Sequence, residues 1–362
     1  MRTTTLWVVL IVLLSCGVAW ADSVDSSAEI ENLKERIRAL EAKAGIGAEG
    51  EQPFTLLALG KHLRFSGLFE LEAGYQKTDG QASQSDLVLA TAQLSTEAAI
   101  NDHIGGRLSL LFEEGETEPV EVDEAVIFLH CPQPLFGQRL GFHGGRMYLP
   151  FGQFNSSMIS DPLTLELGET RNTAALLALD GALWSLSVGA FSGEVGDSSQ
   201  KKIDALVAAL TLTPWEGLSF GASYLSDLGE SDVALVANPT VHGSGVAAAS
   251  AFVSLALGPF GLEGELVTAL DDFDPALVGS NDLTGKRPQA WGLEAGWAAS
   301  EGLQLALRAE GTRDFLDDLQ RYGGTASYGL FPNTVLALEY LYGQPDRGPD
   351  SQTLTAQLAF EF

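Results

Sequence analysis

Cysteine, histidine and basic residues are scarce in this chain, and each shortage excludes a class of protein. Its two cysteines are Cys16 and Cys131, and Cys16 lies in an N-terminal segment that we expect to be removed, so no disulfide is expected within the mature chain. The 5 His residues are scattered, and we interpret His130 beside Cys131 as structural, so neither a metal site nor a cofactor is expected. The 48 Asp and Glu residues outnumber 20 Lys and Arg, for a formal net charge of −28. This balance excludes nucleic acid as a partner, because phosphate binding requires a basic face.

Long apolar runs are also missing, except at the N-terminus. Residues 1–21 are predicted to be a signal peptide, with Arg2 at its positive start and a cleavage site at Ala19-Trp20-Ala21. Lipoprotein processing at Cys16 is the alternative, and both routes export the chain. Beyond residue 21 no apolar run is long enough for a transmembrane helix, although 45% of residues are hydrophobic. An exported chain with this composition suggests a β-barrel, whose lipid-facing residues alternate with polar ones.

A short helix is predicted over residues 22–45, in the periplasm. Its apolar residues follow a spacing of three and four, which is typical of a coiled coil, and two heptads require partner helices for stability. Arg36 to Glu41 resembles a motif that specifies trimers in short coiled coils, so we expect a homotrimer. Residues 46–61, rich in Gly and followed by the first strand, are interpreted as a linker. The residues assigned to trimerisation are Ile30, Leu33, Arg36, Ile37, Leu40 and Glu41.

From His62 to Phe362 apolar and polar residues alternate with a period of two, which predicts strands with one apolar face. Tight turns rich in Gly, Pro, Asn and Asp fall between even and odd strands, and the long connections fall between odd and even strands, as in a closed barrel. The fold class is therefore all-β: a transmembrane antiparallel barrel of about 16 strands with an aqueous lumen. Strands are expected at roughly 62–75, 85–99, 102–114, 119–131, 138–149, 173–180, 182–193, 202–213, 217–227, 246–257, 260–270, 289–299, 302–314, 321–330, 334–343 and 353–362.

The connection at residues 150–172 differs from the other long ones because its composition is mixed rather than purely polar. In general porins the corresponding third loop folds into the barrel, so we predict that it forms the constriction. Its apolar residues Phe154, Met158, Ile159, Leu163 and Leu165 are expected to anchor it against the wall. A solvated external loop is the alternative. The predicted constriction and ligand residues are Arg146, Tyr148, Asp161, Glu166, Glu169 and Arg171.

Three stretches together resemble the LbtU-type siderophore porin family: Asp123-Glu124-Ala125, the pattern from Tyr148 to Phe154, and residues 160–171. The resemblance implies an outer-membrane barrel for passive, TonB-independent uptake of ferric siderophores. A general or substrate-specific porin, for example for dicarboxylates, is the alternative. The terminal Phe362 resembles the C-terminal signal of outer-membrane barrels, which implies recognition by the barrel-assembly machinery.

The inward phase of the strands carries mostly acidic side chains, and a lumen lined in this way favours cations. This conflicts with an anionic siderophore as cargo, unless the ferric complex carries less charge or Arg107, Arg146 and Arg171 cluster at the constriction. Pairing of wall Glu and Arg with one another is the alternative. The predicted pore-wall residues are Arg64, Glu70, Glu72, Arg107, Glu113, Glu124, Glu263, Glu265, Glu294, Arg308, Glu310 and Glu339.

Neither a carboxylate metal site nor a nucleophilic catalytic site is expected. The acidic run from Glu113 to Glu124 is interpreted either as a solvated hairpin tip or as a surface that shares cations with lipopolysaccharide phosphates, rather than as a metal site. No His has a convincing Ser partner for nucleophilic catalysis, and His242 and Ser244 lie in a Gly-rich loop, so the chain is not expected to be an enzyme.

Overall fold

The computed structural model describes residues 62–115, 117–193, 195, 202–233, 235, 245–273 and 286–362. The predicted signal peptide, coiled-coil helix and linker, and with them Cys16, lie outside the described residues. Within that described part, no helix is long and apolar enough to cross a lipid bilayer.

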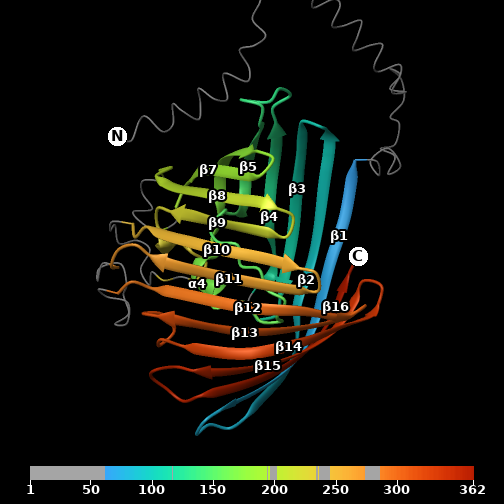
Figure 1. Cartoon of the computed structure of the whole chain (residues 1–362), viewed down its shortest axis with the longest axis vertical. Coiled ribbons are helices and arrows are strands. Elements are labelled where there is room, and N and C mark those ends of the chain that lie inside the picture. The colour runs from blue at the N-terminus through green and yellow to red at the C-terminus, as the bar shows by residue number, and fades with distance from the viewer. Residues whose placement is uncertain are drawn as a thin grey trace, which may run out of the picture. The chain divides into compact units, whose positions relative to one another are not determined.

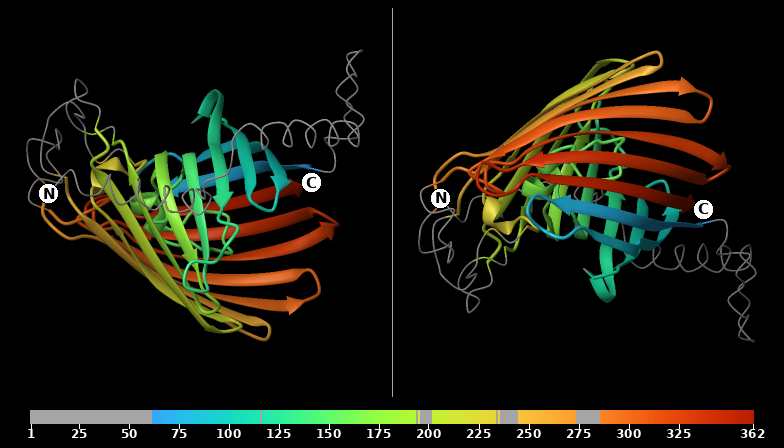
Figure 2. Two further views of the ribbon diagram at one scale, coloured as in Figure 1. Left: turned by 90° about the horizontal axis from the view of Figure 1, so that it is seen from above. Right: turned by 90° about the horizontal axis from the view of Figure 1, so that it is seen from below.

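Sixteen antiparallel strands form a closed barrel in which each strand lies beside its neighbours in sequence, and β1 pairs with β16. In Figure 1 strands β8 to β13 cross the view while β1 and β3 run steeply, as expected for tilted strands on different parts of a barrel wall. Figure 2 shows the same curved wall from two further sides. The predicted antiparallel barrel of about 16 strands is confirmed.

The strands are β1 (Leu63–Thr78), β2 (Gln84–Asn101), β3 (Ile104–Glu113), β4 (Thr117–His130), β5 (Arg139–Tyr148), β6 (Arg171–Asp180), β7 (Trp184–Phe191), β8 (Ala205–Trp215), β9 (Leu218–Leu225), β10 (Ala248–Leu257), β11 (Phe260–Ala269), β12 (Gln289–Ser300), β13 (Leu303–Arg313), β14 (Gln320–Phe331), β15 (Thr334–Gln344) and β16 (Ser351–Glu361). The expected bounds are wrong by a few residues at several ends. One of these errors matters for the site, because β6 begins at Arg171, so the connection between β5 and β6 covers residues 149–170.

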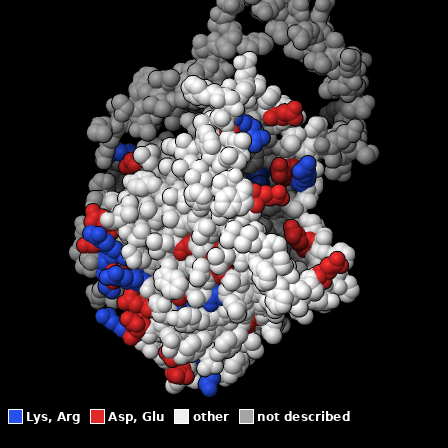
Figure 3. Space-filling model, viewed as in Figure 1, with Lys and Arg blue, Asp and Glu red and all other residues white. Residues whose placement is uncertain are grey.

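Side chains alternate across the wall as the sequence predicts. In β13 Leu307 is 69% exposed on the outside, whereas Arg308 and Glu310 on the inside are 4% and 0% exposed. Figure 3 shows the consequence for one face of the molecule: the surface over the middle strands is mostly uncharged, and charged side chains gather toward its edges. The outer surface is thus a broad apolar face, and the polar residues lie inside or at the ends of the strands.

The barrel closes at the last residue of the chain. Phe362 and Gly67 exchange two backbone hydrogen bonds, at 2.9 and 3.0 Å. A Cβ atom placed on Gly67 would lie 2.5 Å from Phe362 Cζ, so the ring occupies the space that the glycine leaves open. Phe362 also stacks on Phe69 and on Phe360. The terminal residue is therefore part of the seam between β1 and β16.

Candidate functional site: a loop inside the barrel

Residues 149–170, here called the lumen loop, run along the inner wall of the barrel. The loop is closed at its base by a hydrogen bond of 2.8 Å from Leu149 N to Thr170 O. It contains one short helix, α4 (Leu163–Gly168). Its backbone donates hydrogen bonds to inward-facing side chains of β9, β11, β12, β13 and β15, which places it within the lumen.

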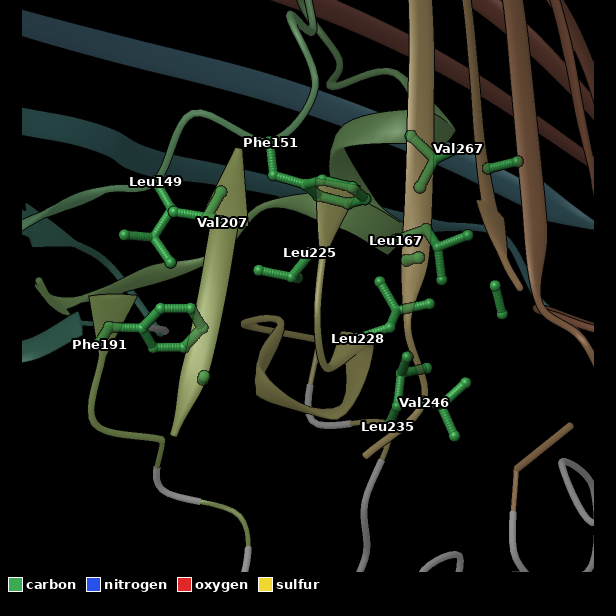
Figure 4. Packing of buried hydrophobic residues seen from close by; sticks show 14 of the residues in the cluster. Leu149, Phe151, Leu167, Phe191, Val207, Leu225, Leu228, Leu235, Val246 and Val267 are labelled. Carbon is green, nitrogen blue, oxygen red and sulfur yellow. The ribbon is translucent and has the colours of Figure 1, made fainter. Parts of the chain in front are cut away.

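One side of the lumen loop is apolar and packs against the wall (Figure 4). Phe151 is 1% exposed and Leu163 and Leu167 are 0% exposed. They belong to one cluster with inward residues of the wall such as Val207 and Val267. Leu163 was predicted as an anchor and is fully buried, whereas Met158, Ile159 and Leu165 are half-buried. Leu149 and Leu167 were not predicted, because nothing in the sequence shows which apolar positions of an irregular loop face a wall.

The loop turns away from β5 with a tight reversal at residues 152 to 154. Gly152 has a φ of +82°, and a Cβ atom there would lie 2.1 Å from Phe154 Cζ. Gly152 N donates to Ser223 Oγ of β9 at 2.9 Å. The Pro-Phe-Gly stretch of the sequence motif therefore has a structural role, because it directs the chain onto the inner wall.

Four wall carboxylates accept hydrogen bonds from the backbone of the lumen loop. An irregular segment away from bulk water must satisfy its N–H groups, and here acidic side chains of the wall do so. Gln153 N and Phe154 N donate to Glu265 at 2.7 and 2.8 Å, Ser157 N to Glu294 at 2.6 Å, Ile159 N to Glu339 at 2.7 Å, and Leu163 N to Glu310 at 2.8 Å.

These contacts change the interpretation of the predicted pore wall. Glu294, Glu310 and Glu339 are 4%, 0% and 2% exposed, so they lie behind the loop rather than along an open passage. All three side chains face the interior, as the alternation in the sequence predicts. These carboxylates accept hydrogen bonds from the backbone of the lumen loop, and the alternation of the strands alone does not predict this role.

Two arginines complete the contact between loop and wall. Arg308 lies 2.9 Å from Glu310 and 3.9 Å from Glu294, and it donates to Ser160 O at 2.9 Å. Arg321 of β14 pairs with Glu310 at 2.6 Å and with Glu166 of the loop at 3.3 Å. Arg321 was not predicted. Buried charges of this kind are stable only when paired, so the acids and bases here form one unit.

A second cluster lies at the root of the loop, where β4 and β5 separate. Their pairing ends at Ala125 and Arg146. Asp123, at a register shift of β4, is 2% exposed and accepts hydrogen bonds from Tyr148 at 2.8 Å and Arg171 at 2.7 Å. Arg171 also pairs with Glu121 at 2.6 Å. At this point the backbone hydrogen bonds between β4 and β5 have ended. Side-chain contacts of Asp123 instead connect β4 to Tyr148 and Arg171, the residues that flank the lumen loop.

The three arginines proposed to gather at the constriction are therefore mostly engaged with acids. Arg171 is held by Asp123, and Arg107 lies 3.4 Å from the adjacent Glu124. The Nε atom of Arg146 is buried without a hydrogen-bond partner. Because Arg107 and Arg171 are each paired with carboxylates, they do not make a dominant basic patch.

The remaining charged groups of the loop are acidic. Asp161 is exposed, and Glu166 and Glu169 are half-buried. Burial, and then the nearby carboxylates of Asp232 and Asp161, raise the pKa of Glu169 to about 7 against the opposing effect of Arg171. Burial also raises the pKa of Glu166, although Arg321 opposes the shift. Asp161, Glu166 and Glu169 together form an acidic edge of the lumen loop.

The other predicted wall residues lie apart from the loop contacts or at their margin. Glu72 accepts a hydrogen bond of 2.8 Å from Gln357 and lies close enough to Glu70 and Asp161 to interact electrostatically. Glu263 accepts from Ser254 at 2.7 Å, and Glu113 accepts from Thr117 at 3.0 Å near the tip of the β3–β4 hairpin. Arg64 is exposed near the start of β1. The predicted trimerisation residues are outside the described residues.

Comparison with curated proteins gives distant relatives. No family model matches the chain. A UPF0422 protein of Coxiella burnetii is 25% identical over 303 residues, which cover 76% of this chain and 63% of that protein. A UPF0422 protein of Legionella pneumophila strain Philadelphia 1 is 22% identical over 303 residues, covering 73% of this chain and 54% of that protein. The chain spans between about half and two thirds of the length of these relatives.

Comparison with solved structures gives porins. The anion-selective porin from Comamonas acidovorans has a TM-score of 0.60 at 12% identity, covering 83% of this chain and 99% of that one. OmpF of Salmonella typhi, solved with daunomycin, has a TM-score of 0.59 at 11% identity, covering 83% and 97%. At such identities the likeness shows the fold alone. The chain has the barrel fold of outer-membrane porins, and the resemblance to siderophore porins stays a prediction.

Proposed function

We propose that this protein is a passive diffusion channel of the bacterial outer membrane that prefers small cationic solutes. The observation that carries the proposal is the lumen loop, which is fixed inside the barrel and carries Asp161, Glu166 and Glu169 on one edge. Charges near a narrow passage act at short range and with little screening, so they decide which ions enter.

The outer surface supports a location in a membrane. Leu293, Leu307 and Leu338 are 50%, 69% and 52% exposed, each near the middle of its strand. In water such a continuous apolar face would promote aggregation, whereas in lipid it is the favourable surface. A closed barrel also pairs its backbone between strands, as a lipid environment requires.

The balance of acidic and basic side chains at the lumen loop supports cations over anions. Arg308 and Arg321 each bind two carboxylates of the wall or loop, and Arg171 binds two as well. Their positive charge is thereby neutralised locally. The acids of the loop edge outnumber the bases beside them, so the net field in the passage is negative.

Ion selectivity of single channels tests this function. The purified protein is inserted into a planar bilayer under a KCl gradient, and the reversal potential gives the ratio of potassium to chloride permeability. We expect a ratio above one. Asp161→Asn should lower it by about fourfold, because one charge roughly 10 Å from the path favours K⁺ by about 0.4 kcal/mol in water and disfavours Cl⁻ by the same amount. Glu301→Gln, in the turn between β12 and β13, is the control and should leave the ratio unchanged. A wild-type ratio of one or below would contradict the proposal.

A ferric siderophore is the narrower cargo that we propose on the motif resemblance. Several motif residues have contacts that need no cargo, since Gly152 turns the loop and Tyr148 and Arg171 hold Asp123. Asp161 and Glu169 are the motif acids that we propose to contact the solute. Concentration-dependent block of the current by a ferric polycarboxylate siderophore, weakened in Asp161→Asn, would support this cargo. Current indifferent to such ligands would leave a general or dicarboxylate porin.

Assembly is a further part of the proposal. We propose a homotrimer joined through the predicted helix at 22–45, and recognition of Phe362 by the barrel-assembly machinery. The packing of Phe362 over Gly67 supports a role for this residue in closing the barrel. Leu40→Asp should dissociate cross-linkable trimers while the barrel stays folded, and deletion of Phe362 should slow membrane assembly in cells.

A further inference from the structure

Two imidazoles lie side by side on the inner wall, outside the region of the lumen loop. His130 ends β4, and His143 lies on β5, where it is directly opposite Phe128. The ring centroids of His130 and His143 are 6.3 Å apart with an interplanar angle of 72°. Both residues belong to the inward phase of their strands, near the end of the barrel that carries the short turns. Neither takes part in the proposed constriction.

The space between the two rings is left open by a glycine. Gly141 is directly opposite His130 in the β4–β5 pairing. A Cβ atom on Gly141 would lie 3.6 Å from His143 Nε2 and 3.8 Å from His130 Nε2. Both Nε2 atoms therefore lie at similar distances from the position that a Cβ atom of residue 141 would occupy. An alanine would fit there without a clash, but its methyl group would fill that point.

The surroundings of the pair are compatible with a cation. His143 is near enough to Asp180 to interact electrostatically. Arg107 also interacts electrostatically with His143, but it lies against the ring of Phe128 and is paired with Glu124. Phe128 in turn packs edge-on against His143 at 5.1 Å. The ring of Phe128 thus contacts both Arg107 and His143, and Glu124 compensates the positive charge of Arg107.

We propose that His130 and His143 form a binding site for a divalent transition-metal ion at the short-turn end of the lumen. Imidazole nitrogen is a preferred ligand of Zn²⁺, Cu²⁺ and Ni²⁺. With Zn–N distances of about 2.1 Å, two rings sharing one tetrahedral ion have centroids roughly 5 Å apart, so a small rotation of the side chains suffices. No cluster of three or more His, Cys, Asp or Glu that could hold a metal occurs among the described residues, so water fills the other positions. The site is open and exchanges its ion with the lumen.

The test uses Zn²⁺ and the folded full-length barrel in detergent. Isothermal titration calorimetry compares the wild type with His143→Ala, Gly141→Ala and the control His103→Ala. His103 is an exposed imidazole in the neighbouring turn between β2 and β3. We expect His143→Ala and Gly141→Ala to weaken Zn²⁺ binding by at least about tenfold, the scale on which lost coordination contacts act, and His103→Ala to have no effect.

Gly141→Ala is the decisive variant because it keeps both imidazoles. Equal affinity in the wild type and Gly141→Ala, or in the wild type and His143→Ala, would overturn the proposal. Folding of each variant is checked by its mobility on unheated denaturing gels. As a second measurement, Zn²⁺ added to single channels should reduce the current reversibly on chelation, and this block should be lost in His143→Ala. The experiment is independent of ion selectivity, so it stands whether or not the channel prefers cations.

Discussion

Glu339 shows what a single wall carboxylate does in this barrel. It is 2% exposed and accepts hydrogen bonds from Ile159 N, Ser160 N and the Thr325 hydroxyl. Glu339→Gln places an amide N–H₂ against these donors, and a buried donor left unsatisfied costs about 1–3 kcal/mol. We expect the lumen loop to fluctuate, which should appear as excess open-channel noise and added conductance levels in bilayer recordings.

The matched control for this change is Glu70→Gln. Glu70 is an inward carboxylate of β1 that interacts electrostatically with Glu72, and β16 separates β1 from β15, which carries Glu339. Its amidation removes the same charge from the lumen. If both variants were equally noisy, the noise would come from lost charge and not from a released loop.

Glu169 should give the proposed channel a dependence on pH near neutrality. Its pKa of about 7 results first from burial and then from the carboxylates of Asp232 and Asp161. The group is neutral below this pH and negative above it, so the potassium preference should rise between pH 6 and 8. Glu169→Gln should remove this rise. A wild-type selectivity that is flat across the interval would show that Glu169 does not face the ion path.

The raised pKa of Glu169 also makes the stability of the folded loop depend on pH. Because the folded pKa of Glu169 lies above its ordinary value of 4.5, the neutral form favours the folded loop. This contribution is fully present below about pH 4.5 and is lost as the pH rises through about 7. The loop is thus held slightly less tightly at the pH where its edge is most negative.

At the scale of elements, the lumen loop depends on Arg308 of β13 for its attachment. The Arg308 side chain is 2% exposed and pairs with Glu294 and Glu310, which are themselves buried. Arg308→Met keeps most of the volume but leaves these carboxylates with less compensation, which typically costs about 3–5 kcal/mol. We expect the variant to unfold at a clearly lower temperature, measured by circular dichroism and by heat-dependent gel mobility.

The control for Arg308→Met is Arg287→Met, at an exposed ion pair with Asp272 just before β12. An exposed pair contributes little, so this variant should unfold like the wild type. A similar loss of stability in both variants would mean that removal of any arginine destabilises this acidic chain.

The strands could be predicted from the sequence because both of their signals are local. Alternation defines the faces, and tight turns such as that at Asn101 define the ends. The interior could be predicted only in part. Alternation placed Glu310 and Glu339 inside, but which of them would meet the loop depends on strands far apart in sequence. The role of Asp123 was missed because the register shift in β4 has no local signal. Arg321 was missed because its partners come from β13 and from the loop.

At the scale of the whole molecule, the polar inner surface and the apolar outer surface of the barrel are suited to different surroundings, water inside and lipid outside. The inner surface is filled on one side by the lumen loop and its ion pairs, and the outer surface is apolar over the middle of the strands. Stability therefore depends on the medium around the barrel as well as on contacts within it. Charges added to the outer surface should be tolerated in the loops and not in the band between them.

Arginine substitutions at two exposed leucines can distinguish a membrane barrel from a water-soluble one. Leu307, near the middle of β13, is 69% exposed, and Leu316, in the connection between β13 and β14, is 42% exposed. In water an arginine at either position would cost little, because both side chains already contact solvent. In lipid an arginine near the midplane of a barrel costs about 2–4 kcal/mol, and one outside the apolar band costs close to nothing. We expect Leu307→Arg, but not Leu316→Arg, to lower the free energy of unfolding from liposomes by that amount in urea titrations. Equal stabilities of the two variants would mean that the apolar face around Leu307 does not contact hydrocarbon.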